Sequence, residues 1–247
     1  MTERIRLASL LRPVRAGNAF EETVERLLSA IRLGVVAPGE RFPAERTFAT
    51  QLGISRITLR EALRELQLAG YVESRRGRHG GTFVTAPPAA PSRGEARRIA
   101  REQSGSLADA LTFRMAIETG AADALARLVR EQPAHDGSGQ VHDVLAERLA
   151  EVNRASPGDY RRLDTLFHLA IAELTGSSLL AAAAADARMR LNDFLNAIPI
   201  LQHNIDHTAV QHAAIADAIL AGDPDAARQT VAEHLEGTAA LLRGFLA

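Results

Sequence analysis

Apolar residues recur every three to four positions along most of the chain, which is the spacing of amphipathic helices. In residues 19–33 these positions are Phe20, Val24, Leu27, Leu28 and Ile31. Pro38 and Gly39 end that segment, and a short helix is expected from Pro43 to Leu52 with the proline in its first turn. A third helix is expected over residues 56–69, closed by Gly70. The pattern therefore predicts three helices within the first 70 residues.

The periodicity changes after Gly70. Residues 71–74 and 82–85 predict two short strands around a tip, residues 75–81, that is rich in glycine and arginine. Between the second and third helices, Gly53-Ile54-Ser55 predicts a tight turn in which Ser55 caps the helix that follows. Three helices and a β-hairpin in this order form a winged helix-turn-helix, and we assign it to residues 18–86.

Residues 87–104 are rich in proline and alanine and are predicted to be a linker. Beyond the linker, few β-branched residues cluster, and residues 105–247 are expected to form an all-α bundle. Its predicted helices lie near residues 106–131, 140–154, 158–175, 178–198, 205–221 and 224–246. The fold class is thus mainly α, in two domains.

Charge is unevenly distributed along the chain. Residues 1–101 hold 18 Arg and 10 Glu, a net charge of +8, whereas residues 102–247 carry −9. A basic module on an acidic body is typical of a protein that docks one end on a polyanion. No signal peptide and no apolar stretch long enough to span a bilayer is evident, so we expect a cytoplasmic protein with no membrane partner.

The third predicted helix carries side chains suited to DNA. Ser55, Arg56, Thr58 and Arg60 lie at its beginning, where hydroxyl and guanidinium groups can meet phosphates and base edges. Bidentate pairing of Arg with guanine is worth roughly 1–3 kcal/mol of discrimination. For any single arginine, a solvated cationic helix face is the alternative.

Four further residues have the character of metal ligands. Asp164 and His168 are four residues apart and share one helix face, while His212 and His234 lie on two later segments separated by Gly222-Asp223-Pro224. The chain has no cysteine, so histidine and carboxylate groups are its candidate metal ligands. One oxygen and three nitrogens would suit Zn²⁺ or a neighbouring divalent ion. A histidine on an amphipathic helix is nevertheless more often a core or rim residue.

The remaining histidines lack a comparable setting. His79, His135, His142, His203 and His207 are expected on the surface or in loops. His203 and His207 are four residues apart, but no further ligand accompanies them in the pattern.

The run FPAERTFATQLGISRITLREALRELQLAG, residues 42–70, resembles the signature of the GntR-type winged helix-turn-helix transcriptional regulators. The resemblance implies a homodimer that binds double-stranded DNA at a short palindromic operator. It also implies DNA contacts by Arg46, Ser55, Arg56, Thr58, Arg60, Arg76 and Gly77.

The later helices resemble the FCD ligand-binding domain of the FadR-like subfamily. The similar segments are FRMAIE at 113–118, LDTLFHLAI at 163–171, QHAAIADAI at 211–219, GDPDAA at 222–227 and EHL at 233–235. The resemblance implies that Asp164, His168, His212 and His234 bind a divalent ion, with Zn²⁺ as the default and Ni²⁺ or Mn²⁺ as alternatives. The chain departs from this pattern after Gly176, where Ser177 replaces the usual asparagine and can cap a helix equally well.

An octahedral ion with four protein ligands keeps two open positions, which a hydroxy- or keto-carboxylate could fill. We therefore expect a transcriptional regulator, in this family more often a repressor, controlled by a small organic acid. Arg114 is a candidate effector-binding residue because a guanidinium pairs well with a carboxylate, and a salt bridge to Glu118 is the alternative.

Two other functions were weighed. One is a regulator that senses a larger acyl ligand and has a structural or empty metal site. The other is a His/Asp metallohydrolase, which needs a general base beside the metal. No His-Glu-x-x-His motif, nucleophile elbow or phosphate-binding glycine loop occurs, so we do not expect an enzyme.

Overall fold

The computed structural model describes residues 19–77, 80–85, 104–131, 138–196 and 202–246. The chain divides into two compact units, Met1–Ala89 and Ala90–Ala247. Apart from Ser104, the predicted linker, residues 87–104, lies outside the described residues.

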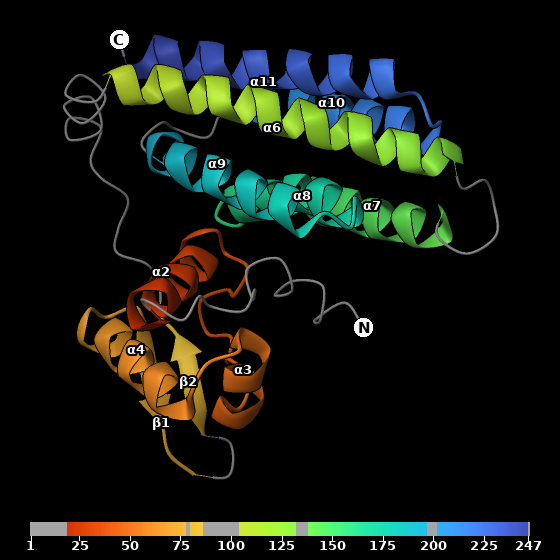
Figure 1. The fold of residues 1–247 in the computed structure, drawn as a ribbon. Coiled ribbons are helices and arrows are strands. Elements are labelled where there is room, and N and C mark those ends of the chain that lie inside the picture. Colours follow the sequence, from red (N-terminus) through yellow and green to blue (C-terminus); the bar gives the residue numbers. More distant parts are fainter. Residues whose placement is uncertain (1–18, 78–79, 86–103, 132–137, 197–201, 247) are drawn as a thin grey trace. The chain divides into compact units, whose positions relative to one another are not determined.

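Over the residues that the structure describes, the N-terminal unit has three helices and a two-stranded sheet (Figure 1). Its elements are α2 (Ala19–Arg32), α3 (Glu45–Leu52), α4 (Arg56–Leu68), β1 (Val72–Arg75) and β2 (Gly81–Val84). Both α2 and α3 pack on α4, and β1 lies beside α4. The strands are antiparallel, with Val72 opposite Val84 and Arg75 opposite Gly81. The predicted winged helix-turn-helix is confirmed.

One apolar core holds this unit together. Leu27 of α2, Phe48 of α3 and Leu59 of α4 are almost fully buried in it, and Val72 and Val84 close it from the hairpin. Burial of each large apolar side chain contributes about 1.5–3 kcal/mol. The core therefore fixes how α4 is held, which matters because α4 and its cap Ser55 carry four of the seven candidate DNA contacts.

The turn between α3 and α4 is as predicted. Gly53 has a φ of +66°, a left-handed conformation that glycine adopts without strain, and it ends α3. The Ser55 hydroxyl accepts a hydrogen bond of 3.0 Å from the backbone N–H of Thr58, which confirms Ser55 as the N-cap of α4. The start of α3 differs from the prediction. Ala44 keeps an extended backbone and its carbonyl accepts the first helical bond, so Pro43 precedes the first turn.

The hairpin forms the wing. Arg75 stacks its guanidinium 4.4 Å from the centre of the Phe83 ring, a cation–π contact that stiffens the strands near the tip. Gly77 has a φ of +107° at the tip, where a side chain would be strained. The wing is thus a short, arginine-bearing projection.

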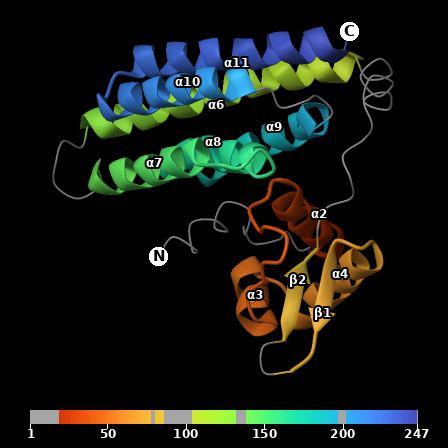
Figure 2. The same ribbon diagram turned by 180° about the vertical axis from the view of Figure 1, so that it is seen from behind.

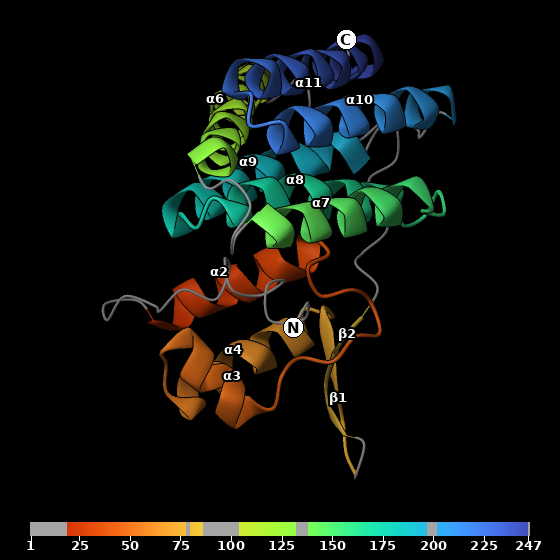
Figure 3. The same cartoon turned by 90° about the vertical axis from the view of Figure 1, so that its right-hand side faces the viewer.

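The C-terminal unit is entirely helical in the part that the structure describes. Its helices are α6 (Ser104–Glu131), α7 (Ser138–Asn153), α8 (Tyr160–Leu174), α9 (Ser178–Asn196), α10 (Gln202–Leu220) and α11 (Pro224–Leu246). They form two layers, with α6, α10 and α11 in one and α7, α8 and α9 in the other (Figures 2 and 3). This confirms the predicted helical bundle. No described helix is long and apolar enough to cross a membrane.

Two turns set the positions of the later helices. Gly222 has a φ of +64°, and a Cβ there would approach the backbone of Arg130 to 3.1 Å, so glycine allows α10 and α11 to meet closely beside α6. Before α9, the Ser177 hydroxyl accepts a hydrogen bond of 3.2 Å from Leu180 N–H. The serine caps the helix, as expected for the position where asparagine is usual.

Candidate metal centre

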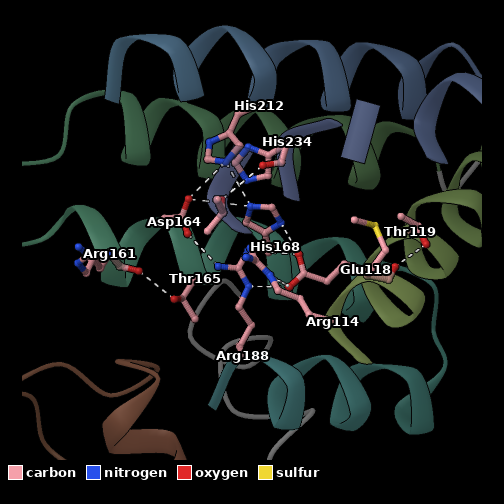
Figure 4. A network of polar contacts seen from close by, with 12 residues as sticks. Arg114, Glu118, Thr119, Arg161, Asp164, Thr165, His168, Arg188, His212 and His234 are labelled. Carbon is pink, nitrogen blue, oxygen red and sulfur yellow. Dashed lines mark hydrogen bonds and ion pairs between the residues drawn. The ribbon is translucent and has the colours of Figure 1, made fainter. Parts of the chain in front are cut away.

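The four predicted metal ligands come together inside the C-terminal unit (Figure 4). Asp164 and His168 lie on α8, His212 on α10 and His234 on α11. One donor atom from each lies within 4.8 Å of the others, and the three histidines are buried. Residues up to 70 positions apart in the chain thus share one small volume.

The spacing of the donor atoms fits one ion. The His168 Nε2 and His212 Nε2 atoms are 3.2 Å apart, and His212 Nε2 lies 3.4 Å from Asp164 Oδ1. His168 Nε2 lies 3.9 Å from the same oxygen. Two ligand atoms that each lie about 2.1 Å from an octahedral ion are about 3.0 Å apart when they are adjacent and about 4.2 Å apart when they are opposite, and the three distances fall in this range. The residues therefore fit a divalent metal ion without a large rearrangement.

Glu118 of α6 contacts three side chains beside the cluster. Its carboxylate is 4% exposed and accepts hydrogen bonds from Arg114 Nε at 2.9 Å and Arg188 Nε at 2.8 Å. His168 Nδ1 lies 2.9 Å from the second carboxylate oxygen. Burial alone would raise the pKa of Glu118, but the two guanidinium groups hold that pKa well below its usual value. Glu118 is therefore a carboxylate and accepts all three bonds.

These bonds determine which histidine nitrogen faces the cluster. Because Glu118 is an acceptor, His168 Nδ1 carries the hydrogen, and His168 Nε2 keeps its lone pair. His234 Nδ1 lies 3.1 Å from the Gln211 Oε1 atom, which also can only accept. The hydrogen of His234 is then on Nδ1, and His234 Nε2 likewise keeps its lone pair for a metal.

Arg188 of α9 links the two carboxylates. Its NH1 donates to Asp164 Oδ2 at 2.9 Å, while its Nε and NH2 atoms bind Glu118. Burial would raise the pKa of Asp164, but Arg188 and the neighbouring histidines hold it well below the usual value. Arg188 binds Oδ2 of Asp164, so the other carboxylate oxygen, Oδ1, faces His212 and His168.

Two polar atoms in this region have no partner. Arg114 pairs with Glu118 through Nε, as the salt-bridge alternative required, but its NH1 is buried without a hydrogen bond. The same holds for His212 Nδ1. Among the described residues these are the two buried side-chain atoms that lack a partner. An unpaired buried donor costs about 1–3 kcal/mol, so a group that accepts from Arg114 is favoured here.

Sequence reasoning missed the outer residues of the cluster. The sequence indicated Glu118 only as a partner of Arg114, and it did not indicate Arg188. One signal for Arg188 was available in the sequence, because the apolar residues Ala184 and Leu191, four before and three after it, share its face of the helix. Nothing local to Glu118 indicated that three elements meet there.

The other histidines stay outside the cluster. His142 and His207 are exposed. His79 and His135 lie outside the described residues, as does the side chain of His203. The pair His203 and His207 therefore includes a side chain that lies outside the described residues.

The candidate DNA contacts lie at the surface of the N-terminal unit. Arg46 of α3, Arg56 and Arg60 of α4, Arg76 and Gly77 of the wing, and Ser55 are exposed, and Thr58 is partly buried. Arg60 Nε donates to Glu45 Oε2 at 2.7 Å, so the first residue of α3 orients the Arg60 guanidinium. The Ser55 hydroxyl also lies 2.8 Å from that of Thr58. All these groups belong to the same compact unit.

The buried histidines make the metal-free protein sensitive to acid. Burial and the charge of Arg188 lower the pKa of His168 to about 4 from about 6.5. The unfolded chain therefore takes up this proton before the folded one, and stability falls as the pH drops below about 6.5. From pH 7 to pH 5, His168 alone removes about 2 kcal/mol from the free energy of unfolding.

Denaturant unfolding of chelator-treated protein at pH 5 and pH 7, followed on the C-terminal unit by hydrogen exchange, measures this loss. The pKa of His234 is lowered by burial as well, so its effect has the same sign. Replacement of His168 by Gln should flatten the pH dependence. Equal stability at the two pH values, or an NMR titration of His168 near pH 6.5, contradicts this description.

Comparisons with known proteins agree with the fold. Residues 20–84 match the model of the gntR family of bacterial regulatory proteins, and residues 109–237 match that of the FCD domain. An Escherichia coli (strain K12) protein, provisionally named as the regulatory protein of the L-lactate dehydrogenase operon, is 30% identical over 243 residues, which are 91% of this chain and 86% of that one.

The HTH-type transcriptional repressor NanR of Escherichia coli (strain K12) is 29% identical over 243 residues, covering 95% of this chain and 88% of NanR. The solved structure of McbR/YncC from E. coli has a TM-score of 0.50 and 22% sequence identity. The match covers 92% of this chain and 97% of that one, and it supports the fold alone. The chain therefore belongs to the gntR family of bacterial regulatory proteins, as a DNA-binding transcriptional regulator with an FCD domain rather than an enzyme.

Proposed function

We propose that the protein is a repressor whose hold on its operator is released by a small organic acid bound at a divalent metal ion. The observation that carries the proposal is the buried set of Asp164, His168, His212 and His234, in which neighbouring groups already orient three of the four donors. Such outer partners are typical of metal sites, where they fix the tautomer and the direction of each ligand.

The ion would be held by Asp164 Oδ1 and by the Nε2 atoms of the three histidines. Zn²⁺ is the default because it accepts imidazole and carboxylate ligands in this number, and Ni²⁺ or Mn²⁺ would fit the same groups. When bound, the ion would supply open coordination positions for oxygen atoms of a ligand.

Charge balance favours an anionic ligand. With the histidines neutral, the carboxylates of Glu118 and Asp164 offset the guanidinium groups of Arg114 and Arg188. A divalent cation adds two positive charges to this buried region, where they are expensive without a counter-charge. A hydroxy- or keto-carboxylate would supply that charge, and Arg114 NH1 is a buried donor without a partner nearby in the network.

The names of the relatives point the same way. One is provisionally named for the L-lactate dehydrogenase operon, and lactate is a 2-hydroxy acid. The other is named as a repressor. The first name supports a small organic acid as the class of effector, and the second supports repression as the sign of regulation.

The operator-binding part of the proposal rests on residues 18–86, joined by residues 87–104 to the effector domain, residues 105–247. We propose that a homodimer binds a short palindrome, and that the contacts come from Arg46, Ser55, Arg56, Thr58, Arg60, Arg76 and Gly77. A two-fold symmetric dimer needs two half-sites at a fixed spacing. A change in the relative placement of its two DNA-binding domains would therefore end simultaneous binding.

The cluster is well placed to start such a change. Side chains of α6, α8, α9, α10 and α11 all contribute to it, so a ligand that draws Arg114 or Asp164 toward itself acts on several helices at once (Figure 4). To move the population from mostly bound to mostly free, the acid needs about 5 kcal/mol of preference for the released state.

Removal of a proposed ligand should abolish tight metal binding. His234→Ala takes away one of four donors, and we expect the affinity for Zn²⁺ to fall at least a hundredfold in calorimetric titration against a competing chelator. His207→Ala is the matched control, because His207 lies on α10 but is exposed. Unchanged Zn²⁺ affinity in His234→Ala would remove the cluster from consideration as a metal site.

The effector mechanism is tested by operator binding of the full-length protein. We expect L-lactate or a related 2-hydroxy acid, added to the Zn²⁺-loaded protein, to weaken operator binding at least tenfold. The same acid should have no effect after chelation or on His234→Ala. If the acid releases chelated and metal-loaded protein equally well, the metal takes no part. If no hydroxy or keto acid changes the affinity for DNA, the effector class is wrong.

The proposed DNA contacts are tested by salt dependence. Arg56→Ala should weaken operator binding by about 1–3 kcal/mol if Arg56 pairs with a base, or lower the salt slope by about one if it meets a phosphate. Arg154→Ala, an exposed arginine of the C-terminal unit, is the control and should change neither. Gel-shift titrations at several salt concentrations give both quantities. Equal behaviour of the two variants would place Arg56 outside the interface.

A further inference from the structure

A large apolar side chain is exposed in the first turn of α4. Among the described residues, the strongly exposed large hydrophobic side chains are Ile57, Leu68, Leu179 and Val210. Ile57 is 70% exposed and directly follows Arg56, at the capped beginning of the helix. The others lie away from any candidate DNA contact in sequence.

The position of Ile57 on the helix is opposite to the core. The buried residues of α4 are Leu59, Ala62, Leu63 and Leu66, which lie on one face. At 100° per residue, Ile57 lies on the other face in line with Arg60 and Arg64, and Arg56 flanks it. Ile57 is therefore an isolated apolar group on a charged face that also carries Glu61, one turn further along the helix.

The exposure of Ile57 brings no benefit to the folded N-terminal unit. A buried isoleucine contributes about 1.5–3 kcal/mol, and most of this is absent at a side chain left in water. A β-branched residue is also a poorer helix former than the charged residues that usually occupy exposed helix positions. Neither packing nor helix propensity explains isoleucine here.

Base edges offer one apolar group to a helix in the major groove, the C5-methyl group of thymine. The arginines around Ile57 match the negative charge of a nucleic acid, and they are unsuited to an apolar protein surface. We propose that Ile57 contacts a thymine methyl group in each half-site and so determines the base preference at that position. This inference rests on the proposed placement of α4 in the major groove.

The test uses full-length protein and an operator selected from random duplex DNA. Each thymine of the selected palindrome is replaced in turn, in both half-sites, by deoxyuridine, which removes only the methyl group. At one position per half-site, the wild-type protein should lose affinity roughly fourfold for each methyl group, the equivalent of one buried methylene. Other thymines should tolerate the change.

Variants then assign the methyl contact to a side chain. Ile57→Ala should bind the thymine and deoxyuridine operators with equal affinity, while Ile57→Val should keep part of the difference. The position is exposed, so neither change should disturb the fold. Leu68→Ala is the matched control, because Leu68 is 72% exposed on the same face of α4 and lies about 16 Å further along the helix. It should discriminate as the wild type does.

The outcomes separate this inference from the proposed function. If the wild type selects a palindrome and Arg56→Ala weakens binding, but Ile57→Ala and the wild type respond equally to deoxyuridine, Ile57 does not determine base preference and the operator contacts stand. If no shared sequence is selected, the placement of α4 in the groove is wrong and the role of Ile57 is wrong with it.

Discussion

The arrangement of the C-terminal unit depends on one buried carboxylate, that of Glu118. Two guanidinium groups and one imidazole donate to it, and they come from α6, α9 and α8. Without this carboxylate, Arg114 and Arg188 would face each other across a buried region with one negative charge between them, which is a severe electrostatic cost. With it, the guanidinium of Arg188 is held where it can also bind Asp164. The ionised Glu118 thereby positions groups that it does not touch.

The consequence of this network is chemical as well as structural. Glu118 accepts a hydrogen bond from His168 Nδ1, so Nε2 of the same ring faces His212 and His234. Arg188 binds Oδ2 of Asp164, so Oδ1 of Asp164 faces the histidine nitrogens. Donors from three helices then face one another although none lies next to another along the chain. A ligand that changes any of these bonds must alter the packing of several helices, which is the kind of coupling that a ligand-controlled regulator requires.

Much of this could be predicted from local patterns, and the limits have a physical cause. Helix periodicity, the Ser55 cap and glycine turns are local, so the elements were predicted to within a few residues. Asp164 and His168 were found because four residues separate neighbours on one helix face. The pairing of Glu118 with Arg188 joins positions 70 residues apart and follows only from how α6 packs on α9. Ile57 was not singled out, although the helical period already places it opposite Leu59 and Leu63; the structure adds that it is 70% exposed in the folded unit.

The claim that these four side chains form a metal site is tested most directly by X-ray absorption at the zinc edge of the Zn²⁺-loaded protein. The account predicts a first shell of nitrogen and oxygen at about 2.0–2.1 Å, with the outer-shell scattering of three imidazole rings. In His168→Ala the same measurement should show one imidazole fewer or no bound zinc. A shell of oxygen alone, or a wild-type spectrum unchanged by loss of His168, would contradict the account.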